Sequence, residues 1–248
     1  MTLLGLILTA VGGGDLLRVL LPRTCGTGPR LAALSLLLLT LLVTGKAALS
    51  LPWWLLTASV VPILLWLSAL RIGPPLPMNA LSSTSRRQSV LIILFLLLSG
   101  ALTIAADAVA RSPVHLPPAG PWEVPTLTLA TGLTLFLIAS ANGLVRAALR
   151  QDAGSGGTAV PPVDPQLKGG RWIGPLERLT LTGLLAVGAY PVAAGLIAAK
   201  GIVRFPEIQA DHENGNKAEY FLVGSFVSWT LAIAAAGLLH LALHSPSA

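Results

Sequence analysis

The sequence predicts an all-α integral membrane protein, a helical bundle of about seven transmembrane helices with its N-terminus outside and its C-terminus inside. Three observations support this prediction. Of the 248 residues, 54% are hydrophobic and only 10% are charged, whereas a soluble domain carries about a quarter charged residues. Apolar runs recur along the whole chain, each close to the ~20 residues that cross a hydrocarbon core. Lys and Arg are concentrated in alternate connections between these runs, as cytoplasmic loops require.

The expected spans follow one another with short polar connections. They are 2–21, 31–49, 53–70, 89–110, 126–149, 179–199 and 220–243. No basic residue precedes the first run, so we interpret it as a retained helix and not as a signal peptide. The second and third runs are separate helices because Pro52 lacks an amide hydrogen and disfavours helix at the residue before it. In the sixth run, Tyr190-Pro191 is expected to bend the helix in the middle of the membrane.

One connection divides the chain. Residues 151–170 are rich in Gly, Pro, Ser and Thr, which is typical of a flexible cytoplasmic linker. The expected organisation is therefore a five-helix part (1–150), the linker (151–170) and a two-helix module (171–248).

Charge predicts the orientation. With the N-terminus outside, the cytoplasmic connections hold eleven of the sixteen Lys and Arg residues. These eleven are Arg18, Arg23, Arg30, Arg71, Arg86, Arg87, Arg146, Arg150, Lys168, Arg171 and Arg178. The outer connections keep Lys46, Arg111, Lys200, Arg204 and Lys217. The excess of positive charge inside favours an inner C-terminus.

Charged groups at the expected outer helix ends are the first candidate site. They are Lys46, Asp107, Lys200, Arg204 and Glu219. Ionisable groups at membrane depth are costly and often functional, so these residues are expected to line a polar vestibule for an ion or a small anionic solute. The alternative is that the cations extend to the interface and the carboxylates face water.

Two further groups are candidates. Glu177 and Arg178 are expected at the inner interface, because a continuous helix rises ~33 Å between Arg178 and Lys200. The expected outer contact is therefore Lys200 or Arg204 with Glu219. On the last helix, small residues repeat every four positions and predict a helix-packing face. They are Gly224, Ser228, Ala232 and Ala236.

Catalytic and metal chemistry find little support in the sequence. Asp15 follows three glycines, as in intramembrane aspartic proteases, but the second aspartate in a span, Asp107, is expected near the opposite face. His240 and His244 share a helix face without a nearby carboxylate, so interfacial histidines are the preferred interpretation. We expect no enzyme, no cofactor, no metal and no nucleic-acid partner.

The two-helix module resembles the C-terminal part of an uncharacterised family of bacterial polytopic membrane proteins, over about 170–237. The resemblance is carried by Gly170-Arg171-Trp172-Ile173-Gly174-Pro175-Leu176-Glu177-Arg178, Ala198-Ala199-Lys200, Arg204-Phe205 and Ala218-Glu219-Tyr220-Phe221-Leu222-Val223-Gly224-Ser225. It implies no activity. It draws attention to Glu177, Arg178, Lys200, Arg204 and Glu219.

The expected function is that of a small permease, channel or transport accessory protein in a bacterial plasma membrane. The alternative is a non-catalytic scaffold or regulatory subunit that binds partner helices, as a homo-oligomer or with another membrane protein. A permease is expected to have a solvent-connected cavity lined by Asp107, Asn142 or Tyr190. A scaffold is expected to be dry, and an enzyme to bring Asp15 to another carboxylate or histidine.

Overall fold

The computed structural model describes residues 1–21, 27–47, 51–69, 81–109, 124–154, 170–209 and 216–244. Within these ranges the chain is helical and has no strand, which confirms the predicted all-α class. The elements are α1 (Thr2–Leu20), α2 (Thr27–Ala47), α3 (Trp53–Ala58), α4 (Val60–Ala69), α5 (Leu81–Val109), α6 (Val124–Leu135), η2 (Phe136–Ser140), α7 (Ala141–Gly154), α8 (Gly170–Ala186), α9 (Tyr190–Gln209) and α10 (Asn216–His244).

Four of the described helical segments are long and apolar enough to cross a membrane, which indicates a membrane protein. They are Thr2–Leu20, Arg87–Val109, Val124–Leu149 and Phe221–His244. Ala32–Lys46 and Trp53–Ala69 are shorter apolar helices. Most of the expected linker, 155–169, lies outside the described residues.

Helix α1 lies at the centre of the larger core, and its contact with α6 depends on glycine. Leu3, Ile7 and Val11 are fully buried on α1. A Cβ added at Gly5 would stand 2.7 Å from the Leu129 backbone nitrogen, and one at Gly12 would stand 2.6 Å from a backbone carbon of α6. Only a residue without a side chain allows two membrane helices to approach this closely.

A cluster of three aromatic rings joins α4, α5 and η2. Trp66 is fully buried, and its ring centroid lies 4.8 Å from that of Phe95 and 5.3 Å from that of Phe136. The tilted ring pairs are in the range in which aromatic side chains attract one another. This cluster fixes the part of the bundle from which the Trp66 indole N–H reaches the polar site described below.

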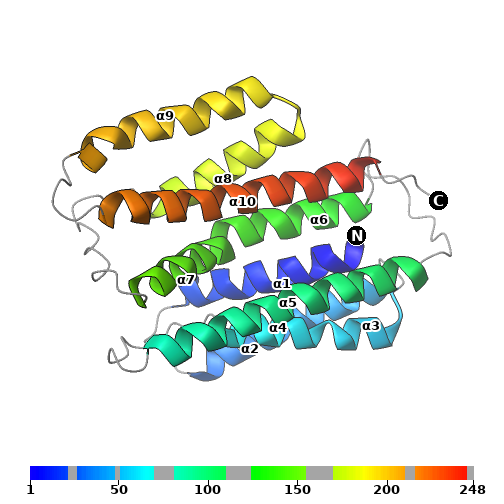
Figure 1. Cartoon of the computed structure of the whole chain (residues 1–248). Coiled ribbons are helices and arrows are strands. Elements are labelled where there is room, and N and C mark those ends of the chain that lie inside the picture. The colour runs from blue at the N-terminus through cyan, green and yellow to red at the C-terminus, as the bar shows by residue number, and fades with distance from the viewer. Residues whose placement is uncertain are drawn as a thin grey trace.

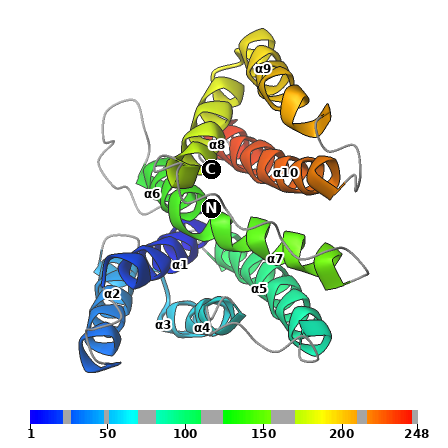
Figure 2. The same cartoon turned by 90° about the vertical axis from the view of Figure 1, so that its left-hand side faces the viewer.

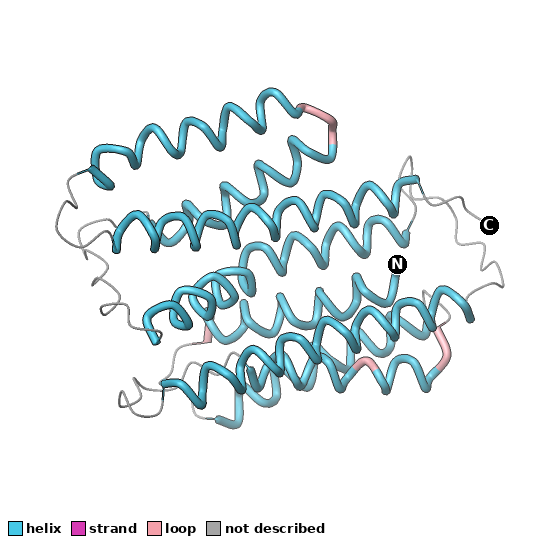
Figure 3. Tube along the Cα trace, in the orientation of Figure 1, coloured by secondary structure: helices cyan, strands magenta, loops and turns pink. Residues whose placement is uncertain are grey.

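The expected sixth span, 179–199, is not one helix, and this prediction is wrong. Helix α8 ends at Ala186 and α9 begins at Tyr190 (Figure 3). Gly188 has a φ of 76°, and the Ala189 and Gly188 amides donate to the Leu184 and Leu185 carbonyls at 2.8 and 3.2 Å. This is a glycine-terminated Schellman motif, which ends a helix.

Proline then begins the next helix. Pro191 is the second residue of α9, within the first turn, where its missing amide hydrogen leaves no bond unmade. The predicted kink at Tyr190-Pro191 is therefore wrong as well. Gly188 and Pro191 together reverse the chain, and α9 runs back beside α8 (Figure 1).

The reversal changes where the chain ends. Helices α8, α9 and α10 form a group on one side of α6, with α1 to α5 on the other side (Figure 2). The first turn of α1 and the last turn of α10 lie at the same end of the bundle (Figure 1). Seven spans, and the expected placement of the two termini on opposite sides, are therefore not confirmed.

Candidate functional site

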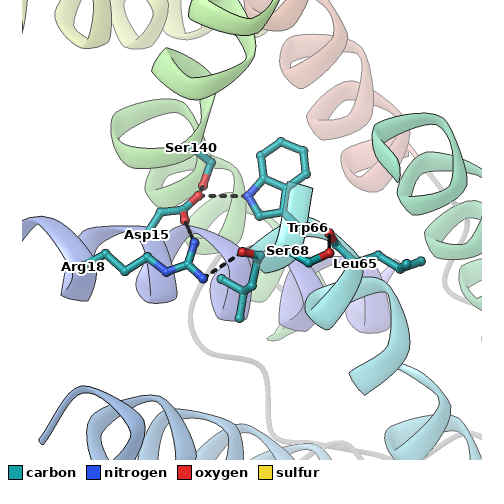
Figure 4. Close-up of polar contacts among 7 residues, drawn as sticks. Asp15, Arg18, Leu65, Trp66, Ser68 and Ser140 are labelled. Carbon is teal, nitrogen blue, oxygen red and sulfur yellow. Dashed lines mark hydrogen bonds and ion pairs between the residues drawn. The ribbon is translucent and has the colours of Figure 1, made fainter. Parts of the chain in front are cut away.

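A carboxylate on α1 collects hydrogen bonds from three elements (Figure 4). The Asp15 Oδ2 atom accepts from Trp66 Nε1 at 2.9 Å and from Ser140 Oγ at 2.7 Å. Its Oδ1 atom pairs with Arg18, which lies one turn further along α1, at 3.3 Å. The Asp15 side chain is 12% exposed. The carboxylate is held by donors and by a cation, and none of its hydrogen-bond partners in the described ranges is a carboxylate or histidine.

The π-helical turn η2 lies between Asp15 and the next polar group. Its last residue, Ser140, donates to Asp15, and its Leu137 carbonyl accepts from Arg178 Nε at 3.2 Å. A π turn is rare and occurs often at functional sites. Here it presents a hydroxyl to α1 and a carbonyl to α8.

Arg178 is buried inside the bundle, with 2% of its surface exposed. Besides the Leu137 carbonyl, its guanidinium donates from Nη2 to Asn142 Oδ1 at 2.6 Å and from Nη1 to Ser228 Oγ at 3.3 Å. The side chain folds back along α8 over Gly174, where an added Cβ would stand 3.4 Å from Nη1. All three of its hydrogen-bond partners are uncharged.

The neighbouring residue, Glu177, joins α8 to α9 and α10. The Lys200 Nζ atom lies 2.6 Å from Oε2 and 2.8 Å from Oε1 of Glu177. Trp229 Nε1 donates to the same carboxylate at 2.8 Å, and Lys200 Nζ lies 5.6 Å from the Trp229 ring centroid. The Glu177 and Lys200 side chains are 11% and 24% exposed. This contact holds α9 against the other two helices.

The five residues of the expected vestibule do not come together. Lys200 pairs with Glu177 and not with Glu219, which is exposed in the first turn of α10. Asp107 is 52% exposed and binds the N-terminal amine. Lys46 lies 5.8 Å from the Trp53 ring centroid, on α2. Arg204 is half-buried on α9. The reason is the reversal at Gly188, which turns α9 away from the end of the bundle where Lys46 and Asp107 lie.

The expected inner pair also separates. Glu177 and Arg178 are adjacent in sequence, but one side chain meets α9 and the other points to η2 and α7. The ~33 Å expected between Arg178 and Lys200 assumed one continuous helix, and it is wrong because the two helices are antiparallel.

The small-residue face on α10 packs within the chain. Ser228, Ala232 and Ala236 are buried, and the Thr182 hydroxyl donates to the Ala232 carbonyl at 3.2 Å. A Cβ added at Gly224 would stand 3.7 Å from a methyl carbon of Leu149 on α7. Arg178 contacts Ser228, and Thr182, four residues later on α8, contacts Ala232, four residues later on α10. Helices α8 and α10 therefore run parallel.

No protein-family model, curated protein or solved structure matches the chain. The resemblance of the C-terminal module to an uncharacterised family stays a prediction. Among the described residues, no group of three or more His, Cys, Asp and Glu is placed to hold a metal ion. His240 and His244 stack with ring centroids 4.0 Å apart.

A small apolar cavity of about 20 Å³ lies between α1, α2 and the α3–α4 pair. Leucine side chains form most of its wall, with Ser59 at the break between α3 and α4. Asp107, Asn142 and Tyr190, the residues expected to line a solvent path, are not part of that wall.

Sequence reasoning missed most of the partners in the polar site. Trp66, Ser140 and Asn142 lie on three segments other than those of the ions they bind. A signal for the reversal was present, because Gly188 followed by Pro191 is the usual order of a helix end and a helix start. Two antiparallel helices in place of one would have placed Lys200 near Glu177 in the prediction.

Proposed function

We propose that the chain is a small permease or transport accessory protein, and that Glu177, Arg178 and Lys200 form its working centre. The observation that carries the proposal is the burial of Arg178, at 2% exposure, inside a bundle whose neighbouring helices are long enough to cross a membrane. Arginine and glutamate inside a bilayer are costly, and they usually mark a path for a solute or an ion.

Stability alone is a weak explanation for these groups. A buried ion pair repays its desolvation only in part, and well-packed apolar residues of the same volume often stabilise a protein as well or better. The main core around α1 is already apolar. A network of an arginine, a glutamate and a lysine in the second helical group therefore fits a functional requirement better than a packing requirement.

The attachment of α9 fits a moving element. Its apolar packing with α8 and α10 is a small cluster around Leu181, Ala193 and Ala232, separate from the main core. Val192, Ile202 and Val203 on α9 are exposed. Elements with few buried contacts open at low free energy, so the pair between Glu177 and Lys200 controls how firmly α9 is held.

The reversal also favours a new orientation in the membrane, with both termini outside. Turning α9 back moves Arg204 and Lys217 to the cytoplasmic end of the bundle, which leaves Lys46 and Arg111 as the cations outside. This asymmetry is larger than in the seven-span arrangement, and positive charge in short loops selects the inner side. The proposed location is a bacterial plasma membrane.

Solute flux tests the proposed function. Proteoliposomes are shifted into isosmotic potassium acetate, potassium phosphate or glycerol, with valinomycin present, and swelling is followed by light scattering. Swelling faster than in protein-free vesicles is expected for at least one solute, with a clear change in Lys200→Gln. The matched control is Glu219→Gln, an exposed charge on α10 that should leave flux unchanged. Absence of flux for all three solutes would refute the permease.

A scaffold that binds partner helices is the second candidate. It is favoured by the exposed apolar side of α9, which includes Ile202, Val203 and Phe205. In that case the protein recovered in a mild detergent carries a second membrane protein or a second copy, and α9 substitutions such as Val203→Ser release it without affecting flux.

A further inference from the structure

The charges in the polar network do not balance at Arg178. Asp15 is paired with Arg18, and Glu177 is paired with Lys200. Arg178 is the most deeply buried of these ions, and its three hydrogen-bond partners are a carbonyl, an amide oxygen and a hydroxyl. A buried cation without an opposite charge at contact distance is costly. An anion that reached it would gain from the same low dielectric surroundings.

Hydrogen-bond donors are also left over at this point. A guanidinium has five N–H donors, and Arg178 uses three of them. The Asn142 and Ser228 oxygens accept from Arg178, which leaves the hydrogens on Asn142 Nδ2 and Ser228 Oγ available to another acceptor. Neither residue donates a side-chain hydrogen bond to another of the described residues. The group therefore offers donors and a positive charge, which is the chemistry of an anion site.

One edge of the group is less deeply buried than the rest. Asn142 and Gly174 are half-buried, whereas Arg178 and Ser228 are buried. At Gly174 a Cβ would stand 3.4 Å from Arg178 Nη1 and 3.5 Å from Asn142 Oδ1. The guanidinium therefore occupies the space that a side chain at residue 174 would need, and the half-buried Asn142 and Gly174 form the more exposed edge of the group.

We infer that Arg178, Asn142 and Ser228 bind a small oxyanion at this edge, either a carboxylate or a phosphate group. The planar guanidinium matches two oxygens of such a group, and the amide and hydroxyl supply further donors. This inference rests on the proposed transport function and names its substrate class.

Calorimetric titration of the full chain in a nonionic detergent tests the inference. The probes are sodium acetate and sodium phosphate, each compared with sodium chloride at equal ionic strength. Saturable binding of acetate or phosphate is expected, and the responding probe identifies the carboxylate or the phosphate source. Binding should weaken at least tenfold in Arg178→Gln and severalfold in Asn142→Ala and Ser228→Ala. Absence of saturable binding of both probes to the native chain would overturn the site.

Controls separate binding from folding. Gly174→Ala places a methyl group against the Arg178 guanidinium and should weaken binding, whereas Gly183→Ala, on the same helix with nothing within 4 Å, should not. If Arg178→Gln does not fold, as judged by circular dichroism, the affinities of Asn142→Ala and Gly174→Ala for the probe test the site instead. Equal affinity in these two variants and in Gly183→Ala would refute the site.

The two proposals fail in different ways. Oxyanion binding without flux would remove the permease and keep the site. Flux that is unaffected by Asn142→Ala and Gly174→Ala would keep the permease and remove the site.

Discussion

The contact between Glu177 and Lys200 allows the attachment of α9 to be measured. Lys200→Met removes the cation and leaves the Glu177 carboxylate, which is 11% exposed, with the Trp229 N–H as its remaining donor. Losing one member of a buried pair costs about 3–5 kcal/mol, and an exposed pair contributes about 1 kcal/mol or less. Because Lys200 is 24% exposed, the expected loss of unfolding free energy is intermediate, about 2 kcal/mol.

A double variant shows whether Glu177 and Lys200 stabilise the protein through their mutual contact. In Glu177→Gln with Lys200→Met, neither charge is left without its partner, and the glutamine oxygen still accepts from Trp229 Nε1. The double variant should therefore be more stable than the sum of the single losses predicts, with a coupling of about 2 kcal/mol.

Reversible unfolding by sodium dodecyl sulfate, followed by tryptophan fluorescence in mixed micelles, measures these free energies. Glu219→Gln is the control, because that carboxylate is exposed on α10. Single losses that add to within about 0.5 kcal/mol in the double variant would refute the reasoning, since additivity means that the two residues do not interact.

Three further predictions concern the backbone and the orientation. Gly188→Ala should destabilise the chain by about 1–2 kcal/mol, because a residue with a Cβ is strained at positive φ, whereas Gly183→Ala in the same unfolding assay should be neutral or slightly stabilising. Gly5→Ala should reduce the yield of folded protein in size-exclusion chromatography, because its methyl group would meet the backbone of α6; an unchanged elution profile and melting temperature would contradict the close approach. In a chain with Cys25→Ser and Ser247→Cys, a membrane-impermeant maleimide should label intact cells, and labelling only after lysis would place the C-terminus inside.

Composition was sufficient for the fold class but not for the path of the chain. The apolar character of α1, α5, the continuous segment from α6 into α7, and α10 follows directly from long runs of Leu, Ala, Val and Ile, and these hold the four spans of sufficient length and hydropathy. The run across 179–199 is also apolar, and hydropathy does not distinguish one helix from two short ones. The turn depends on the backbone at Gly188, a local effect that an average over ~20 residues conceals.

The candidate site was predicted only in part, for a similar reason. Glu177, Arg178 and Lys200 stand out because charged residues are rare in this chain. Their partners do not, since Ser228 and Asn142 are ordinary residues in apolar helices. Arg178 and Ser228 are 50 residues apart, and they meet because α8 and α10 run parallel. That pairing follows from helix packing, which a single sequence does not reveal.

The π turn η2 also determines how α7, which follows it directly, is rotated about the helix axis relative to α6. An α-helix advances by about 100° per residue, and the wider π turn at 136–140 accommodates about one residue more than a regular α-helical turn. With the present length, Leu137 and Asn142 both face Arg178, while Ser140 faces Asp15. If residues 136–140 formed a regular α-helix of the same length, Asn142 would be rotated by about one residue step, roughly a quarter turn, away from the guanidinium. A change in the hydrogen bonding of this turn would thus disconnect the two halves of the polar network without altering any residue in it.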